Sequence, residues 1–221
     1  RPVEKVLLIV ITSDRGLCGA FNANLIKLAK ATIAERYADQ AKKGNVKIWS
    51  IGKKGYEHFQ KNRFNVSDTY KDIFLNLNFE SVQQAAQAAM KGFETGEFDV
   101  VEVIYSQFKN AATQKFEVER FLPIPKVEAK AGATKADFIY DPSKEELIAE
   151  LMPKILNTQL YKAVLDSNAS EHGARMTAMD KASENANEML RSLKISYNRA
   201  RQAAITTELT EIVSGAAALQ G

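Results

Sequence analysis

The chain has 221 residues, 45% of them hydrophobic and 26% charged, so it is long enough to bury a core in one domain or two. Its formal net charge of +3 is too small to indicate a nucleic-acid-binding protein, and its single cysteine excludes an internal disulfide bond. It contains no run of roughly 18 or more apolar residues, so we expect no membrane span and at most a peripheral association with a membrane.

The beginning of the chain has the strand, turn, helix and strand order of a parallel α/β unit. Residues 6–11 are continuously apolar and rich in β-branched side chains, which predicts a strand buried on both faces. A turn with Gly16 and Gly19 follows, then a one-sided apolar pattern that predicts a helix at residues 22–38. A second strand is expected at residues 46–51. Because this order favours parallel pairing through a helical crossover, we predict a Rossmann-like α/β domain.

The middle of the chain adds further helices and a pair of strands. We predict helices at residues 52–62 and 79–94, strands at 65–70, 100–108, 115–121 and 138–140, and a small-residue loop at 129–136. The strand at 115–121 alternates apolar and polar residues and follows the strand at 100–108 after a short polar turn. These two strands therefore predict an antiparallel hairpin with one half-exposed strand.

The C-terminal part predicts a long helix. Ser143 and Glu146 have the spacing of a capping box, which opens a helix at residue 144. Pro153 either begins the long helix in its first turn or kinks it. Gly173 is expected to loosen the helix at the edge of the domain. The residues expected to pack this helix onto the α/β domain are Ile155, Leu156, Leu160, Val164 and Leu165. We place the α/β foot domain at residues 1–142 and the helical region at 143–221.

Residues 174–214 contain neither Gly nor Pro, and as a helix they would span roughly 60 Å. Apolar and small residues recur at alternating spacings of three and four, which is the heptad pattern of a coiled coil. This seam consists of Met176, Met179, Ser183, Ala186, Leu190, Leu193, Tyr197, Ala200, Ala204 and Thr207. Ala and Ser stand where a stable dimer would have Leu or Ile, so a partner helix would pack closely but weakly. A long helix lying on its own domain would explain the seam, but not the small apolar tip at 212–219.

Catalytic interpretations of the motifs are weaker than structural ones. The glycine turn matches neither phosphate-binding fingerprint, so a tight strand-to-helix turn is favoured over a nucleotide site. Cys18 has no histidine nearby in the sequence, which favours a buried structural thiol over a nucleophile. His58 and His172 have no ligands at metal-binding spacing, so we predict no catalytic residue, no metal and no cofactor.

Four basic residues lie on the long helix in a stretch, 189–207, that lacks acidic residues. They are Arg191, Lys194, Arg199 and Arg201. A solvated face is the first interpretation of this band and a protein-binding surface the second. Nucleic acid ranks third, because the band shares its helix with the heptad seam.

Three stretches of the long helix, with the sequences RMTAMD at 175–180, YNRARQAAIT at 197–206 and EIVSGAAAL at 211–219, resemble the gamma subunit of the rotary (F-type) ATP synthase. The turn SDRGLCG at 13–19 is also similar to a signature of that family. The resemblance implies a non-catalytic central-stalk (rotor) subunit that couples proton flow to ATP synthesis or hydrolysis by rotating inside the alpha/beta hexamer. The alternative is a coiled-coil adaptor or scaffold protein with an α/β domain.

The resemblance also implies partners and contact residues. The partners are the alpha, beta and epsilon subunits and the ring of c subunits, on the cytoplasmic face of a bacterial inner membrane. Contact with the beta subunits is assigned to Arg175, Arg199, Arg201, Gln202, Thr206, Glu208 and Glu211. The family begins with a long helix antiparallel to the C-terminal one, whereas this sequence starts at Arg1, without Met, just before its first strand. We therefore expect the sequence to be a fragment that lacks the helix covering the seam.

Overall fold

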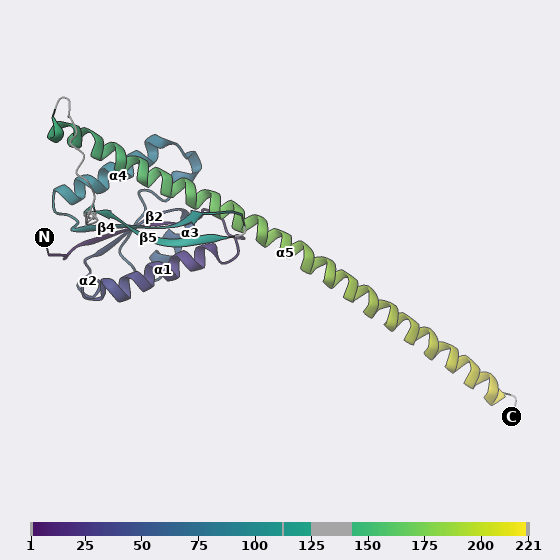
Figure 1. Ribbon diagram of the computed structural model, residues 1–221. Helices are drawn as coiled ribbons and strands as arrows, with labels where there is room; N and C mark the ends of the chain where they lie inside the picture. Colours follow the sequence, from purple (N-terminus) through teal and green to yellow (C-terminus); the bar gives the residue numbers. More distant parts are fainter. Residues whose placement is uncertain (1, 112, 125–142, 220–221) are drawn as a thin grey trace, which may run out of the picture. The chain divides into compact units, whose positions relative to one another are not determined.

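The computed structural model describes residues 2–111, 113–124 and 143–219 (Figure 1). The chain forms two compact units, Arg1–Thr177 and Ala178–Gly221. The first unit contains a sheet with helices on both faces. The second unit consists of the C-terminal part of one long helix.

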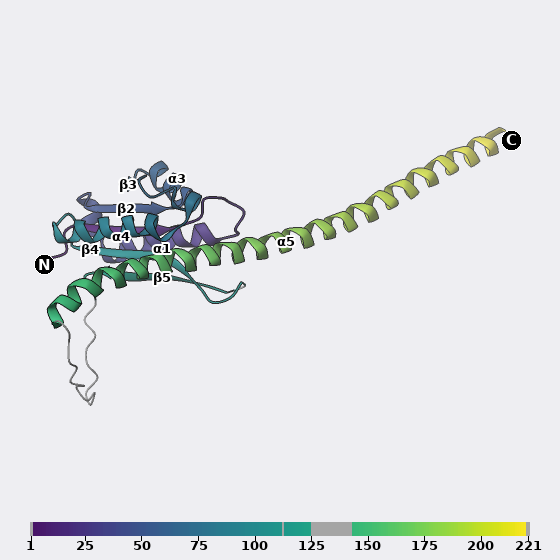
Figure 2. The ribbon, with the colours of Figure 1, turned by 90° about the horizontal axis from the view of Figure 1, so that it is seen from above.

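Five strands form the sheet of the first unit. They are β1 (Val6–Ile11), β2 (Val46–Ile51), β3 (Val66–Ser67), β4 (Val100–Phe108) and β5 (Gln114–Leu122). The spatial order is β3-β2-β1-β4-β5. Figure 2 labels β3, β2, β4 and β5 of this sheet. The first four strands are parallel, and β5 pairs with β4 in the antiparallel direction, as the hairpin pattern predicts. All six residues of β1 are buried, because this strand lies in the middle of the sheet with helices on both sides.

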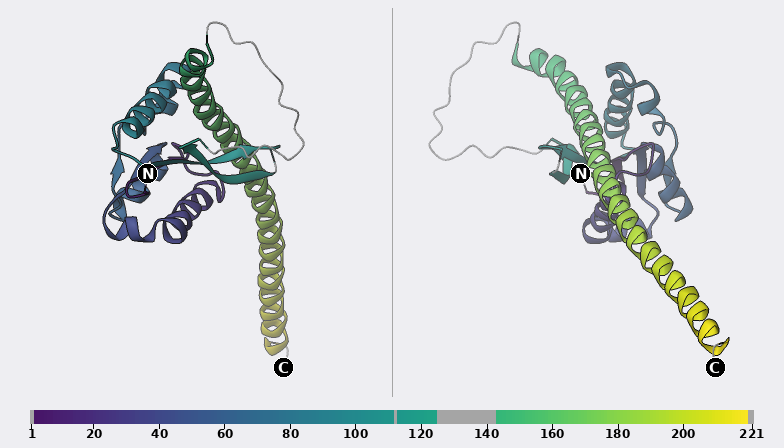
Figure 3. Two further views of the ribbon diagram at one scale, coloured as in Figure 1. Left: turned by 60° about the vertical axis from the view of Figure 1, so that its left-hand side comes forward. Right: turned by 90° about the vertical axis from the view of Figure 1, so that its right-hand side faces the viewer.

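The helices are α1 (Phe21–Arg36), α2 (Ala38–Lys42), α3 (Lys53–Lys61), the 3-10 turn η1 (Ile73–Asn76), α4 (Phe79–Glu94) and α5 (Lys144–Leu219). On one face of the sheet, Leu8 of β1 packs in a core with Leu25 of α1 and Phe59 of α3. On the other face, Ile9 packs in a second core with residues of α4 and of the first part of α5 (Figures 1 and 3). Alternate residues of one strand point to opposite faces, so β1 supplies both cores. This arrangement confirms the Rossmann-like α/β prediction.

Most predicted elements are present, with differences at their ends. The helix predicted at 22–38 is divided, because Tyr37 at φ −131° ends α1 and α2 begins one residue later. The strand predicted at 65–70 is only two residues long, Val66–Ser67. The loop predicted at 129–136 and the strand predicted at 138–140 lie outside the described residues.

The long helix begins at residue 144, as the capping pattern predicts. The backbone N–H of Glu146 donates to Ser143 Oγ over 3.2 Å, so Ser143 caps the first turn. Pro153 lies inside α5 rather than in its first turn, so the interpretation of Pro153 as a helix start is wrong. Predicted packing residues Leu156, Leu160 and Val164 are buried against the sheet and α4.

Two of the predicted packing residues face the other way. Ile155 is 54% exposed and Leu165 is 41% exposed, so the prediction that they pack on the domain is wrong. Each lies next in sequence to a buried residue, and one residue along an α-helix is a rotation of about 100°, which takes its side chain off the packed face. Residues of α5 between Leu156 and Ala174 contribute to the two cores. The compact units divide after Thr177, whereas the predicted boundary at 142/143 coincides with the start of α5.

Gly173 has a different role from the predicted one. The helix continues through Gly173, and a Cβ atom placed there would lie 2.9 Å from the carbonyl oxygen of Ala111. Thr177 Oγ1 also donates to the same oxygen over 3.5 Å. The glycine therefore allows the turn between β4 and β5 to approach the helix backbone. The prediction that Gly173 loosens the helix is therefore wrong. Its role is to permit close packing of the β4–β5 turn against α5.

The second unit has no buried residue in its described part, 178–219. Side chains of the predicted seam are open, for example Leu190 at 52%, Leu193 at 60% and Tyr197 at 69% exposure. In the part of the chain that the structure describes, no helix is long and apolar enough to cross a membrane.

Candidate functional sites: the loop cluster of the sheet edge and the exposed helix

The turn after β1 encloses the single cysteine. Cys18 is 2% exposed, and its Sγ accepts a hydrogen bond from Asn22 Nδ2 at 3.3 Å. The same Nδ2 donates to Ser13 Oγ at 2.6 Å, and the Ser13 N–H donates to Asn22 Oδ1 at 2.9 Å. Cys18 is thus a buried thiol, as predicted, and it helps to close the turn between β1 and α1.

The same turn also accepts hydrogen bonds from the backbone N–H groups at the start of α3. The Lys53 N–H donates to Asp14 Oδ1 at 3.1 Å, and the Gly55 N–H donates to Thr12 Oγ1 at 2.9 Å. Gly52 has φ +102°, and a Cβ there would lie 2.2 Å from the carbonyl oxygen of Thr12. A free helix N-terminus can bind a phosphate, but here the first N–H groups of α3 already have acceptors, because Lys54 N–H also donates, to the carbonyl oxygen of Ser13 at 3.0 Å.

The strand order places a topological switch point between β1 and β4, where open α/β sheets bind ligands at the carboxyl ends of the strands. In this protein α5 fills that position. Ser167 Oγ donates to the carbonyl of Ile11 at 3.4 Å, and Ser170 Oγ donates to the carbonyl of Ser106 at 3.2 Å. Both serines are buried. The helix therefore takes the place that a nucleotide takes in a dinucleotide-binding fold, which agrees with the non-nucleotide interpretation of the glycine turn.

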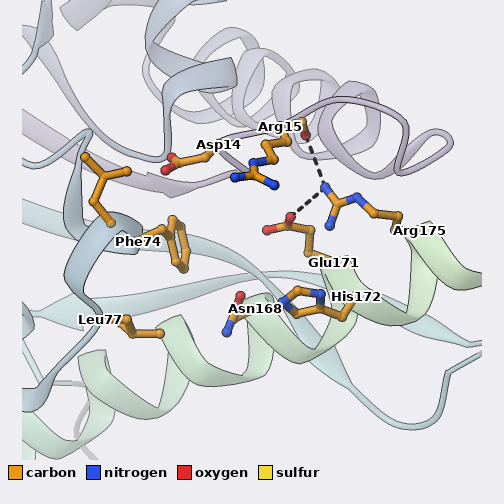
Figure 4. Close-up of a pocket in the computed structure, with 9 residues that line it drawn as sticks. Asp14, Arg15, Phe74, Leu77, Asn168, Glu171, His172 and Arg175 are labelled. Atoms are coloured by element: carbon orange, nitrogen blue, oxygen red, sulfur yellow. Dashed lines mark hydrogen bonds and ion pairs between the residues drawn. The ribbon is translucent and has the colours of Figure 1, made fainter.

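Next to these serines, one arginine ties α5 to the β1–α1 turn. Arg175 donates to the carbonyl oxygens of Arg15 at 3.4 Å and Gly16 at 3.3 Å, and forms an ion pair with Glu171 at 2.7 Å (Figure 4). Glu171 is 8% exposed, so this pair is largely shielded from water. The pair has the i, i+4 spacing that sequence reasoning could have used to find it.

A cavity of about 510 Å³ lies beside this ion pair. It is lined by Asp14, Arg15, Phe74, Leu75, Leu77, Asn168, Glu171, His172 and Arg175 (Figure 4). Glu171 is paired with Arg175, and Asp14 accepts from the α3 backbone, so neither carboxylate is placed as a general base. The residues described in the structure contain no cluster of three or more metal-ligating side chains. The polar groups beside the cavity hold α5 on the β1–α1 turn.

The predicted beta-contact residues fall in two places. Arg175 belongs to the network of the first unit, and its side chain is 23% exposed. The other six lie on the exposed second unit: Arg199, Arg201, Gln202, Thr206, Glu208 and Glu211. None of the four charged residues among these six forms an ion pair with another described residue, so their charges are available to a partner. Sequence reasoning missed Glu171 and the carbonyls of the β1–α1 turn as partners of Arg175.

Comparison with known proteins assigns the chain to a family. The family model described as ATP synthase matches residues 1–219. An ATP synthase gamma chain of Cytophaga hutchinsonii is 52% identical over 223 residues, covering 99% of this chain and 75% of the relative. The gamma chain of Chlorobium phaeobacteroides is 50% identical over 221 residues, again covering 99% of this chain and 75% of the relative.

Solved structures have the same fold. A chain from the Tetrahymena thermophila mitochondrial ATP synthase central stalk and c-ring has a TM-score of 0.59 and 25% identity, covering 83% of this chain and 78% of its own length. A chain from the Euglena gracilis mitochondrial ATP synthase has a TM-score of 0.67 and 22% identity, covering 98% of this chain and 73% of its own length. The chain belongs to the ATP synthase gamma chain family, whose members are non-catalytic subunits of that enzyme.

Proposed function

We propose that this gamma chain is the central-stalk rotor subunit of a proton-driven ATP synthase and contacts the alpha and beta subunits through the second unit, residues 178–219. The observation that carries the proposal is the exposure of this helix on every side, with a seam of small apolar residues and unpaired charges such as Arg199 and Arg201. A helix without a buried face is not stable by propensity alone, so it requires surrounding protein.

The chemistry of this helix differs around its circumference. The seam has small and apolar residues, whereas the basic residues Arg191 and Lys194 lie off the seam. A rotating helix of this kind presents different chemistry in turn to each of three catalytic sites. Each site then changes its affinity for nucleotide because the contact favours one of its conformations over another. The gamma chain itself performs no bond chemistry in this scheme.

We also infer that an antiparallel helix of the same subunit covers the seam. The first unit adds support, since its exposed α5 residues continue the heptad spacing of the seam toward the start of the helix. These residues are Ile148, Leu151, Ile155 and Leu165, all at least 41% exposed. One partner helix could therefore cover an apolar stripe along both parts of α5, which explains why Ile155 and Leu165 are apolar but do not pack on the sheet.

The α/β unit is proposed to rest on the epsilon subunit and the c-ring, on the cytoplasmic face of a bacterial inner membrane. The bacterial gamma chains that resemble this protein support that location. The first unit suits a rigid support, because both faces of its sheet are packed. Ser167 and Ser170 hold α5 to strands β1 and β4, and Arg175 holds it to the β1–α1 turn.

Arg201→Ala in the full-length subunit tests the contact with the beta subunits. We expect weaker ATP turnover or weaker coupling to proton movement, because a lost hydrogen bond to a charged group costs about 1.5–3 kcal/mol. Helix content and thermal melting should not change, since Arg201 has no ion pair among the described residues. The measurements are ATP hydrolysis and proton pumping by the reconstituted synthase.

Lys181→Ala is the matched control, because Lys181 is also exposed on the same helix but lies outside the predicted contact residues. Its effect should be much smaller. Wild-type hydrolysis and pumping in both variants would refute the contact role of Arg201, and unfolding of the Arg201→Ala subunit would assign the residue a structural role instead. Co-purification with alpha and beta subunits separates the rotor function from that of an unrelated coiled-coil adaptor.

A further inference from the structure

A second cavity of about 510 Å³ lies between α1 and α3, on the sheet face opposite to α4. It is lined by Asn22, Ala23, Ile26, Lys27, Lys30, Lys54 and His58. The α1 residues 23, 26, 27 and 30 have the spacing of one helix face, and Lys54 and His58 are four residues apart on α3. The cavity is therefore a groove between two helix faces, within the first unit.

The lining of this groove is positively charged and has no carboxylate. Lys27 and Lys30 come from α1, and Lys54 comes from α3. Glu57, which is outside the lining, is paired with Lys54 at 2.8 Å. Lys27 has no ion pair among the described residues, and Lys30 lies 6.0 Å from the ring centroid of Phe64. Three lysines and no carboxylate line the groove, so its lining favours an anion.

Beneath the lysines the groove is apolar. Ile26 is 8% exposed and, with Ala23, forms part of the apolar lining. Lysine stems add further hydrocarbon, because the charge lies only at the end of each side chain. A bare inorganic anion would use the charges but not this surface, whereas a ligand with a short aliphatic part would use both.

His58 lines the groove from α3. Its Nε2 atom is buried and has no hydrogen-bond partner among the described residues. Burial first, and then the neighbouring Lys30 and Lys61, lower the pKa of His58, so the imidazole is neutral near pH 7. Because Nε2 is closed to solvent, a ligand in the groove would lie beside the imidazole ring rather than on this nitrogen.

We propose that the α1–α3 groove binds a small amphiphilic anion, namely an aliphatic phosphate ester or carboxylate. The anionic group lies among Lys27, Lys30 and Lys54, and the aliphatic group lies on Ile26 and Ala23, beside the ring of His58. This site is separate from the proposed rotor contacts and does not depend on them.

Hexyl phosphate is a suitable probe, followed by histidine NMR on the complete chain. The chain has only two histidines, so His172 on α5 is an internal control. We expect a saturable shift of the His58 resonances alone. The pKa of His58 should also rise when the probe is bound, because a nearby anion favours the imidazolium. Hexanol tests the apolar part alone, and inorganic phosphate tests the charge alone. Both should bind at least about tenfold more weakly.

The double variant K27Q/K30Q should raise the Kd for hexyl phosphate by roughly fivefold to tenfold, since exposed ion pairs contribute modestly. Lys42→Gln, on the exposed helix α2, is the control and should leave Kd unchanged. Equal shifts of both histidines, an unchanged Kd in K27Q/K30Q, or hexanol binding as tightly as hexyl phosphate would overturn the proposal. Equal affinity for inorganic phosphate would overturn it too, because the aliphatic contact would then be absent. Unchanged melting of K27Q/K30Q separates a lost site from a lost fold.

Discussion

At the scale of single residues, Gly173 shows how close packing can reverse an ordinary substitution rule. Inside a helix, Gly→Ala normally stabilises by about 1 kcal/mol. At Gly173 the new Cβ would lie 2.9 Å from the Ala111 carbonyl oxygen and 3.0 Å from its Cα, which are backbone atoms that cannot rotate away. We expect Gly173→Ala to lower the free energy of unfolding by roughly 1–3 kcal/mol, measured by urea denaturation.

Gly215 supplies the matched control for this prediction. It lies in the same helix, and a Cβ there would meet nothing within 4 Å. Gly215→Ala should therefore leave the free energy of unfolding unchanged or raise it, and should increase helix content. A stabilising Gly173→Ala would show that the turn between β4 and β5 can move away from the helix.

Another residue-scale prediction concerns Tyr37, which lies near the buried carboxylate of Glu102. Glu102, on β4, is 1% exposed. Arg36 and Arg120 form ion pairs with it at 3.2 and 3.5 Å. Tyr37 is buried near this group, and burial, together with the Glu102 carboxylate, raises the pKa of Tyr37 from 10.0 to about 12. The folded chain therefore keeps the Tyr37 proton at a pH where the unfolded chain loses it.

The raised pKa of Tyr37 makes the free energy of unfolding depend on pH in alkaline solution. Between about pH 10 and 12 the unfolded state binds fewer protons, so the free energy of unfolding falls as pH rises, by on the order of 2 kcal/mol. Below pH 10 this contribution is fully present. Tyr37→Phe should remove this part of the alkaline loss, whereas Tyr197→Phe, 69% exposed, should not. Urea denaturation across this pH range measures both, and parallel curves for wild type and Tyr37→Phe would contradict the assignment.

At the scale of elements, α5 has two apolar sides in its first part. One side, with Leu156, Leu160 and Val164, is buried against the sheet and α4, and the other, with Ile155, faces outward. Leu160→Ala should lower the free energy of unfolding by about 2–5 kcal/mol because it leaves a cavity in a packed core. Ile155→Ala on the same helix should change it by no more than about 0.5 kcal/mol in this chain. Chemical denaturation of the two variants compares the sides, and equal losses would mean that α5 packs in another orientation.

At the scale of the whole molecule, the two compact units have unequal burial. The first unit has two cores on the two faces of one sheet, whereas the second has no buried residue in its described part. Most helix stability in proteins comes from packing, so we expect residues 178–219 to exchange their amide hydrogens quickly or to pair with a second copy of the chain. Hydrogen exchange, with the mass of the particle checked by light scattering, measures this. Amides of β1 serve as the protected reference, and strong protection of 178–219 in a verified monomer would contradict the expectation.

The sequence by itself determined the elements whose pattern is local. Residues 6–11 and 100–108 are strands with the predicted bounds, and residues 79–94 form α4 as predicted, because unbroken apolar runs and one-sided helical patterns need no distant partner to be interpreted. The motif stretches at 13–19 and along 175–219 also sufficed to indicate the family. The seam of α5 could be predicted in the same way, because all of its residues lie at heptad spacing in one continuous helix.

Tertiary structure alone decided how α5 is used. Between residues 155 and 165, α5 has apolar side chains on all of its sides. Periodicity therefore could not distinguish the side that is buried in the core from the side that is exposed to solvent. Gly173 could not be understood before Ala111 was placed against it, and Arg175 could not be linked to the carbonyls of Arg15 and Gly16, because these contacts join residues far apart in sequence. The position of Ser167 and Ser170 at the ends of β1 and β4 has the same origin. Local pattern predicts an element and its faces, whereas the choice between two apolar faces depends on what the rest of the chain brings to each of them.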